Sequence, residues 1–386
     1  MKVLKLITKN TWRHPLRTSL TVLGLAIAVT AFCVIRTTID AWYSDSKATS
    51  PNILITLNRV SLVFTVPLSA VEKVKKIEGV KGVSYACWFG GTYIDPKNFF
   101  AKFVVDHTTY FDMYPQWVVP PGQMEAFKKE RNAVIVGKKL ADRFGWKLGD
   151  VVRIIGDIYP GDWDFVIRGI YTGAKEGANE LNWFSRFDYL DERMRELAPT
   201  RAGQVGWMIV QIDDPSKAAV MSKTIDDLFK NSSAETKTQT EEAFALSFVE
   251  MSGTIISGLR IVSVLVIGII LLVLANTMAM TARERICEYA VLKTLGFLPR
   301  HLVGLIVGES IAIAAAGGVV GLLLTVLAVV PLMEKALSDY LPVIRLTPLT
   351  VVLGVASALL VGLLAAVFPT FKAVRTSIVD GLRMLD

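Results

Sequence analysis

The sequence has 386 residues, of which 52% are hydrophobic and 20% charged, with a mean hydropathy of +0.45 and a formal net charge of +7. This mean hydropathy is high for a soluble protein of such length, and the apolar residues are unevenly distributed. Residues 18–35, 261–282, 310–333 and 346–371 contain no Asp, Glu, Lys or Arg. Such stretches exclude ordinary soluble helices, because those keep a polar face.

The four uncharged stretches are long enough to cross a membrane. They hold 18, 22, 24 and 26 residues, and a helix needs roughly 20 to cross the hydrocarbon core. Lipid offers the backbone no hydrogen bonds, so these segments must be helical. We predict membrane-spanning helices at 18–39, 254–282, 301–333 and 346–371. The first could instead be a signal peptide, but no small-x-small cleavage site follows it, which favours a retained anchor.

Basic residues are concentrated at one set of helix ends. Residues 1–17, 283–300 and 372–386 together have a charge balance of +8, whereas residues 40–253 have −2. Cytoplasmic loops carry the excess of Lys and Arg. We therefore expect both termini in the cytoplasm, and residues 40–253 and the loop 334–345 outside the cell membrane. The net charge reflects topology and gives no reason to expect nucleic acid as a partner.

The segment at 40–253 predicts a large extracytoplasmic α+β domain between the first and second helices. Its two ends both have the order strand, helix, strand. They are expected to complete one split α+β sandwich, with residues 106–204 inserted as a subdomain. The elements lie at 52–57, 68–77 and 80–89, and again at 205–212, 220–229 and 235–240. Four aromatic residues of the insert are interpreted as core or as an exposed contact patch: Trp163, Trp183, Phe184 and Phe187.

A helical pattern begins before the second membrane helix, near residue 241. No proline occurs between 241 and 282, and a continuous helix of that length would measure roughly 60 Å. This is about twice the hydrocarbon thickness. The pattern predicts a stalk that rises into the outer domain. The alternative is an ordinary amphipathic helix with a break at Ser252 and Gly253.

Residues 283–300, between the second and third helices, predict a short amphipathic helix at the inner membrane surface. Ile286 and Tyr289 share a helical face, and Arg285 and Glu288 have the spacing of an i,i+3 ion pair. A glycine and a proline further on end the helix. The alternative interpretation is a solvated connector held by lipid headgroups.

The third helix contains one carboxylate and several small residues. Glu309 lies near its start, where a charge is either buried and paired or reaches the interface. Small residues permit close helix contact, within the chain or across a dimer. Those singled out are Gly317, Gly318, Gly321, Gly354 and Gly362.

Known catalytic and cofactor-binding patterns do not occur in the sequence. His14, His107 and His301 fall in different segments and cannot converge on one metal ion or triad. No G-x-x-x-x-G-K-S/T motif is present to hold nucleotide phosphates. We therefore expect a non-catalytic chain without a cofactor or metal of its own.

Four segments, in order, resemble the FtsX/MacB-type permeases of ABC transporters. ERICEYAVLKTLGF at 284–297 is similar to their cytoplasmic motif, and GES at 308–310 to the start of their third helix. PTFKAVRTSIVDGLR at 369–383 resembles their C-terminal end, and VGKKLADRFGWKLGDV at 136–151 a part of their periplasmic domain. The resemblance covers essentially the whole chain.

This resemblance implies a stand-alone permease subunit, with a MacB-like periplasmic domain, in the bacterial inner membrane. In this family, ATP and Mg²⁺ are bound by an ATPase subunit, here a separate chain, and its closure moves the outer domains. The implied partners are that ATPase, a second permease copy and membrane lipids, with a periplasmic adaptor and an outer-membrane channel left open. An FtsX-like regulator of an extracytoplasmic peptidoglycan hydrolase is the alternative. The residues implied in coupling to the ATPase are Glu284, Arg285, Glu288, Tyr289, Leu292, Lys293 and Gly296.

Overall fold

The computed structural model describes residues 13–43, 49–174, 178–251, 253–337 and 344–378. These residues form two compact units. Residues 13–41, 253–337 and 344–378 make a helical unit, and residues 42–251 make an α+β unit. Each unit is described by itself.

The helical unit contains four candidate membrane spans among the described residues, which confirms the predicted fold class. Three spans begin with proline at the first helical position, where its missing N–H is tolerated. The third continues through a π-helical turn at Thr325–Val329 into α14 (Val330–Leu337). The fourth is made of α15 (Pro348–Ala365) and α16 (Val367–Arg375). The first two spans are α2 (Pro15–Trp42) and α11 (Gly253–Glu284), and the third begins with α13 (Pro299–Leu324).

Glycines of α13 and α15 bring helices of the same chain into close contact. A Cβ atom at Gly321 would lie 2.6 Å from the backbone oxygen of Ala26 in α2. A Cβ at Gly362 in α15 would lie 2.5 Å from the Ala314 side chain in α13. The hydroxyl of Thr30 in α2 donates to the backbone carbonyl of the buried Gly321 at 3.0 Å. These small residues therefore serve packing within the chain, one of the two alternatives expected.

The two ends of the α+β unit together form four antiparallel strands in the order β12–β1–β11–β3. β4 pairs with β3 just before the insert, and the strands of the insert extend the same sheet from β4 in the order β9–β6–β8–β5, with β7 paired to β8. The strands are β1 (Ile53–Asn58), β2 (Val66–Pro67), β3 (Val80–Trp88), β4 (Lys102–Val105), β5 (Trp117–Val118), β6 (Ala133–Gly137), β7 (Val151–Gly156), β8 (Gly161–Gly173), β9 (Trp183–Arg186), β10 (Gln204–Val205), β11 (Trp207–Ile212) and β12 (Thr236–Thr240). Among them, β2 pairs with β10 in a separate ribbon.

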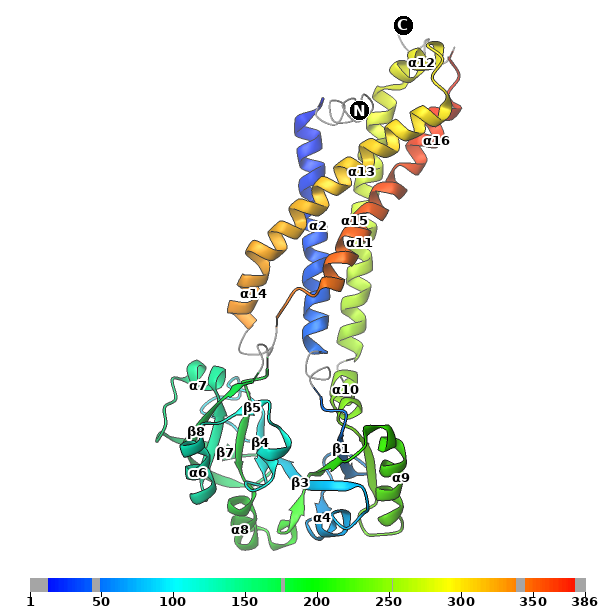
Figure 1. The fold of residues 1–386 in the computed structure, drawn as a ribbon. Coiled ribbons are helices and arrows are strands. Elements are labelled where there is room, and N and C mark those ends of the chain that lie inside the picture. Colours follow the sequence, from blue (N-terminus) through cyan, green and yellow to red (C-terminus); the bar gives the residue numbers. More distant parts are fainter. Residues whose placement is uncertain (1–12, 44–48, 175–177, 252, 338–343, 379–386) are drawn as a thin grey trace. The chain divides into compact units, whose positions relative to one another are not determined.

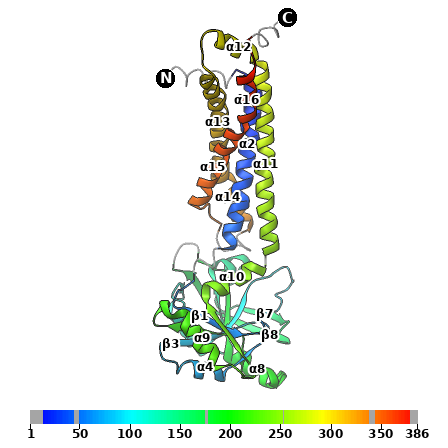
Figure 2. The same cartoon turned by 90° about the vertical axis from the view of Figure 1, so that its right-hand side faces the viewer.

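Helices cover both faces of this sheet (Figure 2). Successive side chains of a strand point to opposite faces: Leu54 of β1 packs with α4 and α9, whereas Ile55 packs with α5 and α6. The four aromatic residues of the insert that were left open are at most 4% exposed, so they belong to the core and form no surface patch. The helices are α4 (Ser69–Val74), α5 (Tyr110–Met113), α6 (Pro121–Lys129), α7 (Lys138–Phe144), α8 (Phe187–Leu197) and α9 (Ala218–Leu228).

The chain enters and leaves the α+β unit at one place. The backbone N–H of Ser50, just before β1, donates to the carboxylate of Glu241 at 2.7 Å. Glu241 begins α10 (Glu241–Met251), which follows β12 directly. Whether α10 and α11 form the continuous stalk expected, or break at Ser252, lies outside the described residues.

Candidate functional site

The predicted short helix lies between α11 and α13, at the end of the helical unit where α16 also ends (Figures 1 and 2). This is α12 (Ile286–Thr294). Gly296 has a φ of +86°, the left-handed conformation that ends helices, and its N–H donates to the carbonyl of Lys293. Pro299 then starts α13. The sequence therefore folds here into a tight helix–turn–helix connection.

A buried ion pair attaches α12 to α13. Nη1 of Arg285 donates to Oε2 of Glu309 at 2.8 Å, and both side chains are 5% exposed. Buried charges are retained when they are paired. Of the two possibilities for Glu309, burial with a partner is therefore the one observed. Tyr289 lies one helical turn beyond Arg285 and is also buried, which raises its pKa to about 12.

Two further ion pairs attach this segment to α2. Arg17 forms two parallel hydrogen bonds with Glu284, of 2.7 and 2.8 Å. Arg13 pairs with Glu288. Spacing along one helix suggested Glu288 as a partner of Arg285. In the folded bundle Arg285 pairs with Glu309 of α13, and Glu288 pairs with Arg13, just before α2.

Lys293 attaches α12 to the end of α16. Its Nζ donates to the backbone carbonyls of Ala373, Val374 and Thr376 at 3.0, 3.0 and 2.7 Å. The last carbonyls of a helix lack partners within the helix, and a cation near them is favourable. Leu292 is half-buried and packs against the core of the helical unit.

Sequence reasoning missed the part of this segment that is exposed. Leu295 is 71% exposed, and Val291, Phe297 and Leu298 are each about half exposed. We call these four residues the apolar tip. The available signal was the apolar run around Gly296. The exposed apolar surface was missed because the charged side chains of an amphipathic helix were expected to face solvent. Here several of these charged side chains face other helices.

Comparisons with known proteins identify the family. Residues 18–228 match the model of the MacB-like periplasmic core domain, and residues 260–378 that of the FtsX-like permease C-terminal region. This chain belongs to the FtsX/MacB-type ABC transporter permeases.

Relatives of this permease are distant in sequence. An uncharacterised ABC transporter permease of Methanocaldococcus jannaschii, MJ1507, is 24% identical over 99% of this chain and 98% of its own length. The extracellular domain of the transporter YknZ from Gram-positive bacteria is 15% identical, covering 49% of this chain and 100% of its own, with a TM-score of 0.36. The periplasmic region of MacB from Actinobacillus actinomycetemcomitans is 14% identical, covering 54% and 96%, with a TM-score of 0.39.

Family membership gives the general role of the FtsX/MacB-type permease. It is a transmembrane subunit of an ABC transporter in the inner membrane, and such a subunit implies an ATPase partner. The family is one of transmembrane permease subunits, which agrees with the expectation of a non-catalytic role.

Proposed function

We propose that this permease transmits force, coupling ATP hydrolysis in a separate subunit to movement of its outer domain for export or extraction of a substrate. The observation that carries the proposal is the attachment of α12. The segment made of α12 and the two residues before it is joined by charged side chains to the start of α2, to α13 and to α16. A displacement of α12 therefore acts on several helices together.

The predicted coupling residues divide into two roles in this proposal. Arg285, Tyr289 and Lys293 anchor α12 inside the bundle, and Glu284 and Glu288 tie it to α2. Direct contact with the ATPase is assigned to the apolar tip, with Gly296 setting its turn. Exposed apolar residues gathered at one end of a membrane protein are typical of a contact surface.

The proposed orientation follows the charge distribution. The end that carries α12 is cytoplasmic, together with both termini, because it holds the excess of basic residues. The α+β unit is then extracytoplasmic. ATP and Mg²⁺ belong to the ATPase subunit, and a second permease copy completes a dimer. An adaptor and an outer-membrane channel are further partners to be sought by co-purification.

Replacement of Leu295 by Asp tests the docking surface. We expect the variant to be inserted and folded as the wild type, because the side chain is exposed. We also expect it to lose its ATPase subunit on co-purification from membranes, since burying an unpaired carboxylate in an apolar interface is costly.

Leu197→Asp is the matched control, because Leu197 is 52% exposed on the α+β unit. It should retain the ATPase. Equal recovery of the ATPase with wild type and Leu295→Asp would contradict docking at the apolar tip.

A further inference from the structure

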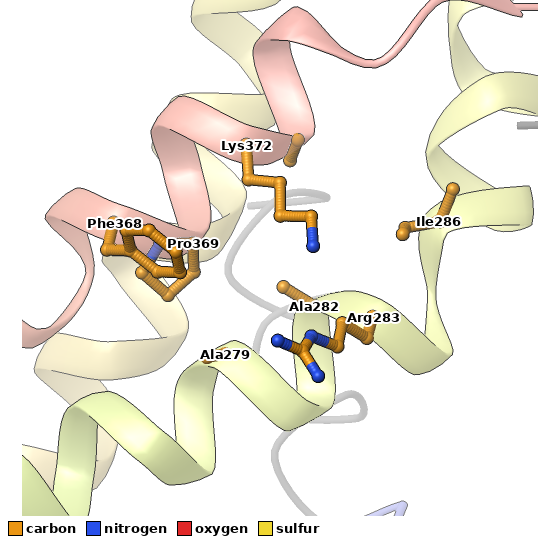
Figure 3. Close-up of a pocket in the computed structure, with 8 residues that line it drawn as sticks. Ala279, Ala282, Arg283, Ile286, Phe368, Pro369 and Lys372 are labelled. Atoms are coloured by element: carbon orange, nitrogen blue, oxygen red, sulfur yellow. The ribbon is translucent and has the colours of Figure 1, made fainter. Parts of the chain in front are cut away.

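A cleft opens between α11 and α16 close to the start of α12. Its walls are apolar, and two cationic side chains reach into it from the two helices (Figure 3). The cations are Arg283 of α11 and Lys372 of α16. The other lining residues are Ala279, Ala282, Ile286, Phe368, Pro369 and Ala373.

These two cations differ from most basic residues around them. Arg13, Arg17 and Arg285 each pair with a carboxylate, and Lys293 is held by three carbonyls. Within the part of the chain that the structure describes, neither Arg283 nor Lys372 forms an ion pair or a side-chain hydrogen bond. Both are exposed. Two like charges beside one cleft repel each other, so an anion placed between them would be stabilised.

The surroundings of the cleft are suited to an amphiphile. Phe368 and Phe371 of α16 are 61% and 55% exposed, although they lie in a candidate membrane span. The guanidinium of Arg375 lies over the ring of Phe371, 4.0 Å from its centroid. A ligand with a negative head and a hydrocarbon chain would satisfy both the cations and these apolar side chains.

We infer that this cleft binds an anionic phospholipid, with the phosphate between Arg283 and Lys372 and an acyl chain along the exposed aromatic face of α16. Basic pockets between helices at the cytoplasmic membrane surface are suited to anionic headgroups. Free phosphate would leave the apolar walls in water, which favours the lipid as the source of the anion. The bound lipid would join α11 to α16 beside α12, so it would stiffen the end of the bundle that carries the apolar tip.

The test measures lipid retention by the purified full chain in detergent. Phosphatidylglycerol and phosphatidylcholine with identical acyl chains are supplied together, and bound lipid is counted by native mass spectrometry. The wild type should prefer phosphatidylglycerol by roughly tenfold or more, since each basic residue near a phosphate contributes measurably. Arg283→Gln/Lys372→Gln should bind the two lipids about equally. Addition of inorganic phosphate should leave the preference in place.

Arg300→Gln is the control, because Arg300 is exposed at the same end of the bundle but lies outside the cleft. It should keep the wild-type preference. Arg283→Glu should reject phosphatidylglycerol and serves as a second variant. An unchanged preference in the double variant, or loss of the preference on adding inorganic phosphate, would overturn the lipid assignment.

Discussion

At the scale of single residues, breaking the Arg285–Glu309 pair is expected to lower the free energy of unfolding strongly. Both charges are almost fully buried. Removing one partner leaves the other charge buried without compensation, which costs about 3–5 kcal/mol. Replacing both with apolar residues of similar volume removes that cost. The pair therefore fixes the position of α12 more than it adds net stability.

We predict that Arg285→Met lowers the thermal stability of the helical unit strongly, whereas Arg285→Met/Glu309→Leu recovers most of it. Unfolding in detergent, followed by circular dichroism, measures both. If the proposed force transmission holds, the double variant should also reduce ATP-dependent motion of the complex, because α12 is then less firmly held to α13. Equal stability of the single and double variants would show that the two charges do not interact.

Lys102 gives a pH-dependent prediction in the α+β unit. Its Nζ is buried, donates to the carbonyls of Gly91 and Phe100, and lies 3.9 Å from the centre of the Phe100 ring. Burial lowers its pKa to about 8 from 10.5, and the charge of Asp157 opposes the shift only partly. Between pH 8 and 10.5 the unfolded chain binds more protons at this site than the folded one, so its contribution to folding stability rises with pH.

Denaturant unfolding of the wild type and Lys102→Met at pH 7.5 and 9.5 measures this effect. Tryptophan fluorescence reports the α+β unit, which contains seven of the eight tryptophans. Relative to Lys102→Met, the wild type should gain stability as the pH rises. The opposite sign, or parallel behaviour of the two proteins, would contradict a folded-state pKa near 8.

The sequence predicted a short helix within residues 283–300 but not the partners of its side chains. The helical spacing suggested Glu288 as the ion-pair partner of Arg285. In the folded chain Arg285 pairs with Glu309, which is 24 positions away. Arg13 and Arg17 were interpreted only as topology signals, yet both reach carboxylates some 270 positions away. Contacts of this range depend on how the helices pack, which a charge pattern does not contain.

At the scale of elements, the close packing of α2, α13 and α15 depends on the absence of side chains at a few positions. Gly321→Ala would place a Cβ 2.6 Å from the backbone oxygen of Ala26, and only movement of a helix can relieve that contact. We predict a loss of about 1–3 kcal/mol from this overpacking. The thermal midpoint in detergent should fall accordingly.

Gly304→Ala is a control in the same helix, because nothing lies within 4 Å of the added Cβ. It should be neutral or slightly stabilising, since alanine favours helices over glycine. Equal effects of the two substitutions would show that helix propensity, not contact with α2, decides the outcome.

Elements themselves were the most predictable part of the molecule. The uncharged stretches identified all four spans, because lipid tolerates no other arrangement of the backbone over such lengths. Less could be predicted for the α+β unit. The insert joins the sheet formed by the two ends of the unit where its strand β9 pairs in parallel with β4, some 80 residues earlier in the chain. Alternation along a strand shows which face is buried but not which strand lies beside it.

At the scale of the whole molecule, the proposed force transmission requires a path from the membrane helices into the α+β unit, and the chain segments before β1 and after β12 offer one. The Ser50–Glu241 hydrogen bond ties these segments together where β1 begins and α10 starts. Glu241 is partly buried, and burial raises its pKa, although the Ser50 N–H opposes the shift. Through its hydrogen bond to Ser50, Glu241 is expected to hold the segment before β1 and the start of α10 together at the edge of the sheet.

We predict that Glu241→Ala reduces the nucleotide-dependent motion of the outer domains while ATP hydrolysis by the complex continues. A spin label at Val220→Cys, on exposed α9, measures the distance between the two copies of the proposed dimer with and without ATP, in a Cys287→Ser background. Glu242→Ala is the neighbouring control, because Glu242 is exposed. If the distance distribution of the wild type does not change on adding ATP, force transmission is refuted. If Glu241→Ala shows the same ATP-dependent change in distance as the wild type, only the role of the Ser50–Glu241 hydrogen bond is refuted. The two outcomes separate the mechanism from the path by which the motion enters the sheet.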